Sequence, residues 1–406
     1  MIPEVDRSSD RADQLDAGVH PVRDGMVVLP RVVQVPLTLL TGKPHTGQRS
    51  VELSAHVHVV GAFASMAGGF AVTAAAMTLG RWWNVLCLIG VAMTLHGMRN
   101  ARMMIFHQAA HRNLYGRKSV DEFFGRLCAA LLLVQNFREY SREHTADHHS
   151  KHHMTLRDPT VQAFLVGLDL DPTMSRQQMW RRVSTKLISP RFHVMFSISR
   201  LVSFWSKADV PERAMAIILY GSFAGAATLT HSWLIFLVGW LLPLIPLFQV
   251  SNTLRLCVKH TFPAPGRECI TGRERMAALT NAIFLGEPVP PRDLPVTVRT
   301  VQWTAWVIRM STVHAFARYL VLTGDTVCHD FHHRFPKDKL WFNYISGRQR
   351  DAENPSKSWP EYTEVWGLKN AIDHVFDSLR ASDPTIFDKS KITGVSSRSL
   401  FAAFDD

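Results

Sequence analysis

The stretch that decides the fold is FREYSREHTADHHSKHHMTLRD, from Phe137 to Asp158. It contains five histidines within ten positions: His144, His148, His149, His152 and His153. Neutral imidazole is the commonest metal ligand in proteins, and it suits iron, zinc and copper alike. So dense a histidine cluster is typical of a metal site, although it does not say which metal is bound.

Two shorter histidine clusters use similar spacing. The first is HQAAH, with His107 and His111, and the second is HDFHH, with His329, His332 and His333. Residues three or four apart share one face of a helix, so each cluster can direct its imidazoles to one place. HQAAH is not a zinc-protease motif, because Gln108 stands where that motif has its glutamate base. Together the clusters predict a polynuclear metal site built almost wholly from imidazole.

The composition favours a chain divided between membrane and water. Hydrophobic residues make up 47% of the 406 residues, the mean hydropathy is +0.00 and the formal net charge is +11. Positive charge beside long apolar runs suits lipid headgroups or an acidic protein partner, so we expect no nucleic-acid partner. The five cysteines form no CxxC pair, which argues against a disulfide framework, a zinc ribbon or an iron–sulfur centre.

Four stretches with few charges pair into two hairpins. The expected spans are residues 57–80, 82–104, 213–230 and 232–256. A helix of about 20 residues at about 1.5 Å per residue crosses a hydrocarbon core of about 30 Å. One run alone could be a buried helix of a soluble protein, but two adjacent runs joined by a tight turn favour a transmembrane hairpin. Pro243 and Pro246 should kink the last span.

The charges of the connecting segments predict the orientation. The two turns hold only Arg81, whereas the long segments that follow the hairpins are rich in Arg and Lys. By the positive-inside rule, these segments, all the histidine clusters and both termini lie in the cytoplasm. We therefore expect a multi-pass integral membrane protein, in a bacterial inner membrane rather than the endoplasmic reticulum.

The expected fold class is all-α: four transmembrane helices in two hairpins, with a cytosolic helical cap that carries a histidine-rich dimetal site. Residues 1–50 are expected to be a polar, partly disordered cytosolic segment, residues 51–380 the membrane domain, and residues 381–406 a polar tail. Three further apolar stretches, 127–137, 187–205 and 298–321, are too short or too charged to span. We expect them to form amphipathic helices on the membrane or in the cap.

The second arm of each hairpin leads directly into histidines. Continued as a helix, the first such arm reaches His107 and His111, and the second reaches His260. Both arms emerge on the side expected to be cytoplasmic, so they project these side chains into the same aqueous layer. This agreement between topology and motif position strengthens the metal-site interpretation.

These motifs resemble the membrane fatty acid desaturase and hydroxylase superfamily, which includes alkane monooxygenases. HQAAHRNLYG resembles its first histidine box, FREYSREHTADHH with the following Asp158-Pro159 its second, and HDFHHRFP its third. The segment RLCVKH, which ends at His260, matches a lone histidine after the fourth span, with Lys259 where the family often has an acid. The resemblance covers roughly His107 to Pro336.

The resemblance implies two non-haem iron ions, O2 as co-substrate and a lipid or other acyl substrate. The implied iron ligands are His107, His111, His144, His148, His149, His260, His329, His332 and His333. It also implies a separate electron donor of the ferredoxin, rubredoxin or cytochrome b5 type, with its reductase. The chain has neither a cysteine cluster nor a His-Pro-Gly-Gly segment that would supply electrons from within.

Ligating imidazoles need partners on their second ring nitrogen. The candidates are Asp147, Asp158, Asp325 and Asp330, with His152 and His153 beside the ligands. The register of the second box is the open point, because His144, His148 and His149 fit the family as HxxxHH, while His149, His152 and His153 fit it as HxxHH. The distance to Asp158-Pro159 favours the first triplet. We therefore predict that His153 is not a ligand.

The leading functional interpretation is an O2-dependent diiron oxidoreductase that removes hydrogen from a fatty acyl or other long aliphatic chain, as a desaturase. A hydroxylase or monooxygenase shares the first hydrogen abstraction and is the alternative. A histidine-rich metal transporter would need ionisable residues within its spans, and these spans contain almost none. A zinc hydrolase would need fewer histidines and a clear acid or base beside the metal.

Overall fold

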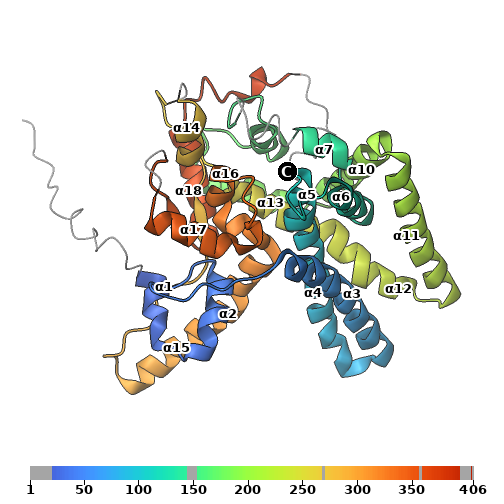
Figure 1. The fold of residues 1–406 in the computed structure, drawn as a ribbon, viewed down its shortest axis with the longest axis horizontal. Helices are drawn as coiled ribbons and strands as arrows, with labels where there is room; N and C mark the ends of the chain where they lie inside the picture. The colour runs from blue at the N-terminus through green and yellow to red at the C-terminus, as the bar shows by residue number, and fades with distance from the viewer. Residues whose placement is uncertain (1–20, 144–152, 268–269, 356–358, 394–403, 405–406) are drawn as a thin grey trace, which may run out of the picture.

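The structure is a computed structural model that describes residues 21–143, 153–267, 270–355, 359–393 and 404. It is almost entirely helical, with two three-residue strands, so the expected all-α class is essentially confirmed. Two helical hairpins extend away from a region where α13, α16, α17 and α18 gather (Figure 1). This arrangement separates a long, apolar part of the protein from a compact cap.

The first hairpin consists of α3, a short turn and a second arm that continues into the first histidine cluster. Its elements are α3 (Ala55–Leu79), η2 (Arg81–Val85), α4 (Leu86–Asn100), the π-helical η3 (Ala101–Phe106) and α5 (His107–Ala110). α3 contains no charged residue, and it ends at Gly80, whose φ of +66° reverses the chain. A non-glycine residue adopts this conformation only at a cost, so glycine suits the turn.

Small residues allow α3 and α4 to approach closely. A Cβ atom on Gly69 would lie 2.5 Å from the carbonyl oxygen of Gly90, and one on Gly97 would lie 2.5 Å from that of Ala62. Between apolar helices in a membrane, backbone approach at small residues replaces the hydrophobic effect as the source of packing energy. These glycines therefore hold the second arm, and the histidines that follow it, in place.

The second hairpin has a kinked arm. Its elements are α11 (Val210–Leu229), α12 (Trp233–Phe236), the π-helical η6 (Leu237–Leu241) and η7 (Pro243–Leu247), and α13 (Phe248–Lys259). The two prolines fall in the π-helical part, where the regular bonding of an α-helix is interrupted. The buried guanidinium of Arg200 donates to the carbonyl oxygen of Leu244 at 2.9 Å and also to that of Leu132. A neighbouring helix thus satisfies backbone groups in the kinked region.

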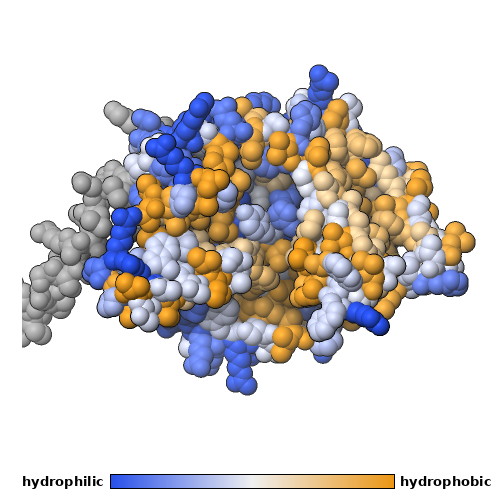
Figure 2. Space-filling model, turned by 90° about the horizontal axis from the view of Figure 1, so that it is seen from below, coloured by the Kyte–Doolittle hydropathy of each residue, from blue (hydrophilic) through white to orange (hydrophobic). Residues whose placement is uncertain are grey.

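One arm of each hairpin is long and apolar enough to cross a membrane. Among the described residues, Ala55–Leu79 and the continuous helix Trp233–Lys259 meet this criterion of length and composition. Seen from below, the protein presents a largely hydrophobic face that is hollowed near its centre (Figure 2). These features fit the predicted membrane protein, while the four-span topology stays a prediction.

The segments between and after the hairpins form the cap. Those between them are α6 (Lys118–Leu132), α7 (Phe137–Glu143), α8 (Pro159–Gln162), η5 (Ala163–Gly167), α9 (Arg176–Ile188) and α10 (Pro190–Lys207). Those after them are α14 (Gly272–Ala278), β1 (Ala282–Phe284), α15 (Val296–Arg309), η8 (Met310–His314), η9 (Ala317–Val321), η10 (Gly324–Cys328), α16 (His329–Arg334), η11 (Trp341–Asn343), α17 (Tyr344–Glu353), β2 (Glu364–Trp366), α18 (Leu368–Ala381) and η12 (Lys389–Lys391). β1 and β2 pair in parallel, with Ala282 opposite Glu364.

The N-terminal part of the chain is more structured than the sequence analysis expected. It forms α1 (Pro21–Gly25), η1 (Met26–Val28) and α2 (Arg31–Thr41), which pack against α15 and η8. The shared core consists of Val22, Met26, Leu37, Trp306 and Met310. The helices fold here because the apolar residues bury one face, while the buried guanidinium of Arg23 is satisfied by Gln34 and Thr38.

The described part of the C-terminal segment also packs on the cap. Phe387 and Phe404 are both buried. Phe387 meets Phe262 edge to face, and Phe404 meets Phe192 in the same way. The sequence analysis expected a polar tail, and it missed these contacts because two isolated aromatic residues give no periodic pattern.

Close packing of the first hairpin predicts opposite effects for the same substitution at two glycines. Gly69→Ala should lower protein stability by about 1–3 kcal/mol, because the new methyl group meets the backbone of α4. Gly225→Ala, on α11, has nothing within 4 Å of the new methyl group. It should be neutral or stabilise by up to about 1 kcal/mol through helix propensity. Thermal unfolding of the two variants in detergent checks this, and equal shifts would contradict the packing.

Candidate metal centre

The first hairpin delivers two histidines at the end of its second arm. His107 begins α5, and His111 follows its last residue, with its backbone N–H donating to the carbonyl of His107 at 3.2 Å. The preceding turn, η3, is a π-helix, which is often found at functional sites because the extra residue changes the direction of the side chains that follow. Both histidines are therefore placed by a helix that the first hairpin anchors.

The second hairpin delivers His260. α13 ends at Lys259, and His260 itself is extended, with φ −142° and ψ 150°. Its side chain is buried, and its Nδ1 lies 3.3 Å from the hydroxyl of Thr280. Leaving the helix at this residue turns the imidazole away from the helix axis and into the cap.

The short helix α16 supplies three histidines, and it divides them. His329, His332 and His333 are all buried. His332 turns to His107 and His111, while His329 and His333 turn to His260. A six-residue helix thus contributes to two separate histidine groups at once.

Two groups of three histidines result. The first histidine group is His107, His111 and His332, and the second histidine group is His260, His329 and His333. Within each group one nitrogen from every ring lies within 4.8 Å of the others. The rings of His329 and His332 are nearly parallel, with centroids 6.1 Å apart, so the two groups are neighbours. The structure therefore brings together six of the nine predicted ligands.

The donor set fits two cations of the kind that imidazole binds. The Nε2 atoms of His107 and His332 are 2.9 Å apart, and those of His329 and His333 are 3.0 Å apart. Two imidazole nitrogens at this distance repel unless a proton or a cation lies between them. Burial lowers the pKa of His329 well below its usual value, and the positive charge of Lys259 adds to this. Neutral imidazoles are the form that binds iron, zinc or copper.

His153 lies beside the second histidine group, where the sequence analysis did not expect a ligand. Its ring meets His260 with centroids 4.4 Å apart and His333 at 5.4 Å. Burial lowers its pKa to about 3, and the positive charges of Lys259 and Arg275 add to this. His153 is thus a neutral, buried imidazole next to two predicted ligands.

The competing triplet cannot be compared with it directly. His144, His148 and His149, together with His152 and Asp147, lie outside the described residues. Their assignment as ligands, or as partners of ligands, stays a prediction.

Asp325 is placed as a partner of the first histidine group. Its carboxylate oxygen lies 4.0 Å from Nδ1 of His332, and it accepts a hydrogen bond from Gln108 at 3.3 Å. Burial raises the pKa of Asp325 to about 7, although the hydrogen bond from Gln108 lowers it. Near neutral pH this carboxyl group can therefore hold or release a proton beside His332.

Asp158 and Asp330, the other two candidate partners that the structure describes, have different contacts. Asp158 accepts from the backbone N–H groups of Met154 and Thr160, at 2.7 and 2.8 Å, and lies 3.9 Å from Nδ1 of His153. Asp330 has both oxygens on the guanidinium of Arg348, at 2.9 and 3.0 Å. These contacts of Asp330 therefore hold α16 against α17 and involve no imidazole.

Tyr140 and Thr280 contact predicted ligands, and the sequence analysis missed both. The hydroxyl of Tyr140 lies 3.4 Å from Nδ1 of His107, and its ring packs under the guanidinium of Arg102 at 4.3 Å. In the same way, the hydroxyl of Thr280 lies 3.3 Å from Nδ1 of His260. Neither residue belongs to a histidine motif, so only the folded chain could reveal these contacts.

Comparison with known proteins agrees with the geometry. The model of the family described as fatty acid desaturase matches residues 80–366, which run from the turn of the first hairpin to β2 and include every predicted ligand. No curated protein and no solved structure matches the chain. The match covers more than half of the sequence and confirms the resemblance that the histidine boxes indicated. The chain belongs to the fatty acid desaturase family.

Proposed function

We propose that this protein is an O2-dependent diiron oxidoreductase of a membrane, and that it removes hydrogen from a fatty acyl or other long aliphatic chain as a desaturase. The observation that carries the proposal is the convergence of six histidines, from three separate segments, into two adjacent groups. Family membership supports the coarser statement that the protein is a lipid-directed oxidoreductase.

Each histidine group would hold one iron ion. His107, His111 and His332 would bind the first, and His260, His329 and His333 the second, with His144, His148 and His149 as the remaining predicted ligands. Bound iron would activate O2, the oxidant that breaks an unactivated C–H bond, which amino-acid side chains cannot do.

The protein's own side chains would prepare this site. Tyr140 and Thr280 face Nδ1 of His107 and His260, so they can hold the ring orientation that directs Nε2 to the metal. The carboxylate of Asp325 lies 4.0 Å from Nδ1 of His332, where its charge can favour a proton on that nitrogen. The buried positions of His260, His329 and His333 keep bulk water from this group.

The membrane orientation of the site and its electron donor are inferred from the sequence. We propose that the histidine groups and both termini are cytoplasmic, and that a separate ferredoxin, rubredoxin or cytochrome b5 type donor delivers electrons. The net charge of +11 and the many Arg and Lys residues after each hairpin support a basic docking face for that donor.

Product analysis tests the reaction. The purified, iron-loaded protein should convert an acyl substrate only when O2 and an added electron donor with its reductase are present, and the product should carry a new double bond. Turnover should fall as ionic strength rises from about 0.05 to 0.5 M, because salt screens the docking charges. Mass spectrometry of the product distinguishes a desaturase from a hydroxylase. Turnover with NADPH and O2 alone would contradict the separate donor.

Removing His260 should affect metal binding specifically. His260→Ala takes one imidazole from the second histidine group, so we expect the iron content to fall from two ions per chain towards one, and activity to be lost. The matched control is His231→Asn in the turn of the second hairpin, where φ is +51° and asparagine is well tolerated. Iron analysis of both variants checks this, and equal iron content would contradict the assignment.

The position of His153 beside His260 and His333 predicts that His153 takes part in metal binding. The spacing of the second histidine box predicts that it does not. Because its ring contacts His260 and His333, we expect His153→Ala to lower bound iron and activity, as His148→Ala should. His193→Ala, remote in sequence from every histidine box, is the control. If His153→Ala kept wild-type iron content while His148→Ala lost it, the original register with His153 as a bystander would be correct.

A further inference from the structure

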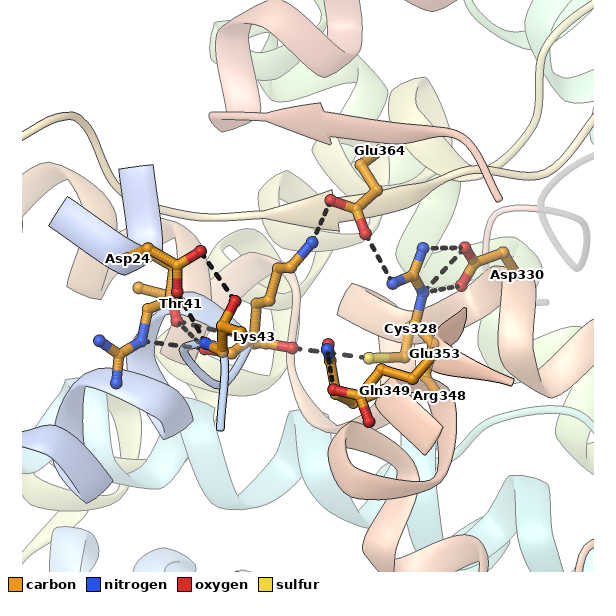
Figure 3. Close-up of polar contacts among 12 residues, drawn as sticks. Asp24, Thr41, Lys43, Cys328, Asp330, Arg348, Gln349, Glu353 and Glu364 are labelled. Carbon is orange, nitrogen blue, oxygen red and sulfur yellow. Dashed lines mark hydrogen bonds and ion pairs between the residues drawn. The ribbon is translucent and has the colours of Figure 1, made fainter. Parts of the chain in front are cut away.

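Asp330 attaches the first turn of α16 to the rest of the cap. Its carboxylate accepts from Nε of Arg348 at 3.0 Å and from one terminal nitrogen at 2.9 Å, and both side chains are almost completely buried. Arg348 lies on α17 (Figure 3). A two-point contact of this kind fixes direction as well as distance.

The contact continues to the N-terminal segment. The other terminal nitrogen of Arg348 donates to Glu364 on β2 at 2.9 Å, and the second oxygen of Glu364 accepts from Lys43 at 2.5 Å. Figure 3 shows these four side chains as one chain of alternating charges. It joins α16, α17, β2 and the residues after α2, which are more than 280 positions away from α16 in sequence.

The surroundings of Arg348 and of Glu364 favour the charged form of each side chain. Burial opposes the charge on Arg348, but Asp330 and Glu364 raise its pKa above the usual value. Burial also opposes the charge on Glu364, but Arg348 and Lys43 hold its pKa below the usual value. The chain is thus a set of ion pairs in a region shielded from solvent, where such contacts are strongest and most directional.

The N-terminal segment reaches α16 by a second route. Gly42 ends α2 with φ +81°, and a Cβ atom there would lie 2.9 Å from the side chain of Val327. The thiol of Cys328 lies 3.8 Å from the carbonyl oxygen of Gly42. Val327 and Cys328 directly precede His329. The segment therefore contacts the residues that lead into α16, and it is linked to Asp330 through Glu364 and Arg348.

These contacts matter because α16 cannot orient itself. Isolated helices shorter than about 12–15 residues are marginal in water, so a helix of six residues depends on its tertiary contacts. Half of its residues are histidines, and they serve both histidine groups. A small rotation of α16 would move ligands of both groups together.

We infer that Lys43, Glu364 and Arg348 are positioning residues for the metal centre, which hold α16 through Asp330 in the orientation that presents its three histidines. The N-terminal segment is then part of the support of the site. This inference rests on the proposed function, because it takes the histidines of α16 as metal ligands.

The experiment measures metal binding to full-length protein in detergent, with Fe2+ and, as a spectroscopic probe, Co2+. We expect metal affinity to fall progressively from Lys43→Met through Glu364→Gln to Arg348→Met. The loss should reach about 10–100-fold where a change releases the support of a ligand. The visible Co2+ spectrum should change in the same order, because ligand geometry changes. Lys43→Arg keeps the charge and should restore wild-type binding, whereas Arg348→Lys loses the two-point contact and should not.

The matched control is Arg309→Met at the end of α15, which removes an ion pair of 2.7 Å to Glu287, away from α16. It should leave Co2+ affinity and spectrum unchanged. Because Arg348→Met removes a buried charge and can also impair folding, the partly exposed Lys43 and Glu364 variants are decisive. The melting temperature of the metal-free protein is recorded for each.

The possible results separate the inference from the proposed function. Lower affinity with an altered Co2+ spectrum in the Lys43 and Glu364 variants supports positioning. Wild-type affinity in both variants overturns the inference alone. The same holds if affinity is weaker but the Co2+ spectrum is unchanged and the metal-free protein loses stability to an equal extent. A wild-type protein that binds neither Fe2+ nor Co2+ overturns the proposed function and with it the inference.

Discussion

The structure depends on holding six imidazoles together in two adjacent groups, four of them buried. At His329, burial lowers the pKa well below its usual value, so this ring is neutral. Neutral rings whose nitrogens face one another at 2.9–3.0 Å repel unless a cation or proton lies between them. The surrounding helices therefore have to hold the rings in this arrangement, and much of the architecture serves this purpose.

The two hairpins impose it from the membrane side. In the first, backbone contact at Gly69 and Gly90 fixes the arm that ends in His107 and His111. In the second, the kinked arm ends at His260, and the guanidinium of Arg200 satisfies carbonyls where the helix is irregular. Buried arginines that cap carbonyls are costly to desolvate, but each makes several bonds and links segments that are distant in sequence.

The cap imposes the arrangement from the other side, through α16. Asp330, in the first turn of this helix, is bound to Arg348 in a pair that is almost fully buried. Removing one partner of such a pair typically costs about 3–5 kcal/mol, because the other charge is left uncompensated. A contact of this strength is well suited to a helix that is too short to be stable alone and that has to serve two histidine groups.

The family, the helical class and the residue type of the candidate metal centre could be predicted from the sequence alone. These are local properties: the spacing of HQAAH and HDFHH, the five histidines after Phe137 and the length of the apolar runs can all be read without knowing what lies nearby. The sequence also predicted six imidazoles as ligands, and the fold brings these six together.

Only the tertiary structure decided how these residues are combined. The division of α16 between two groups, the contacts of Tyr140 and Thr280, and the place of His153 beside His260 depend on the relative positions of separate helices. The same holds for the link from Lys43 to Asp330, whose members show no shared pattern along the chain. Sequence periodicity reports which face of an element is apolar, but contacts between elements are set by packing and by pairing of buried charges, which a local pattern does not contain.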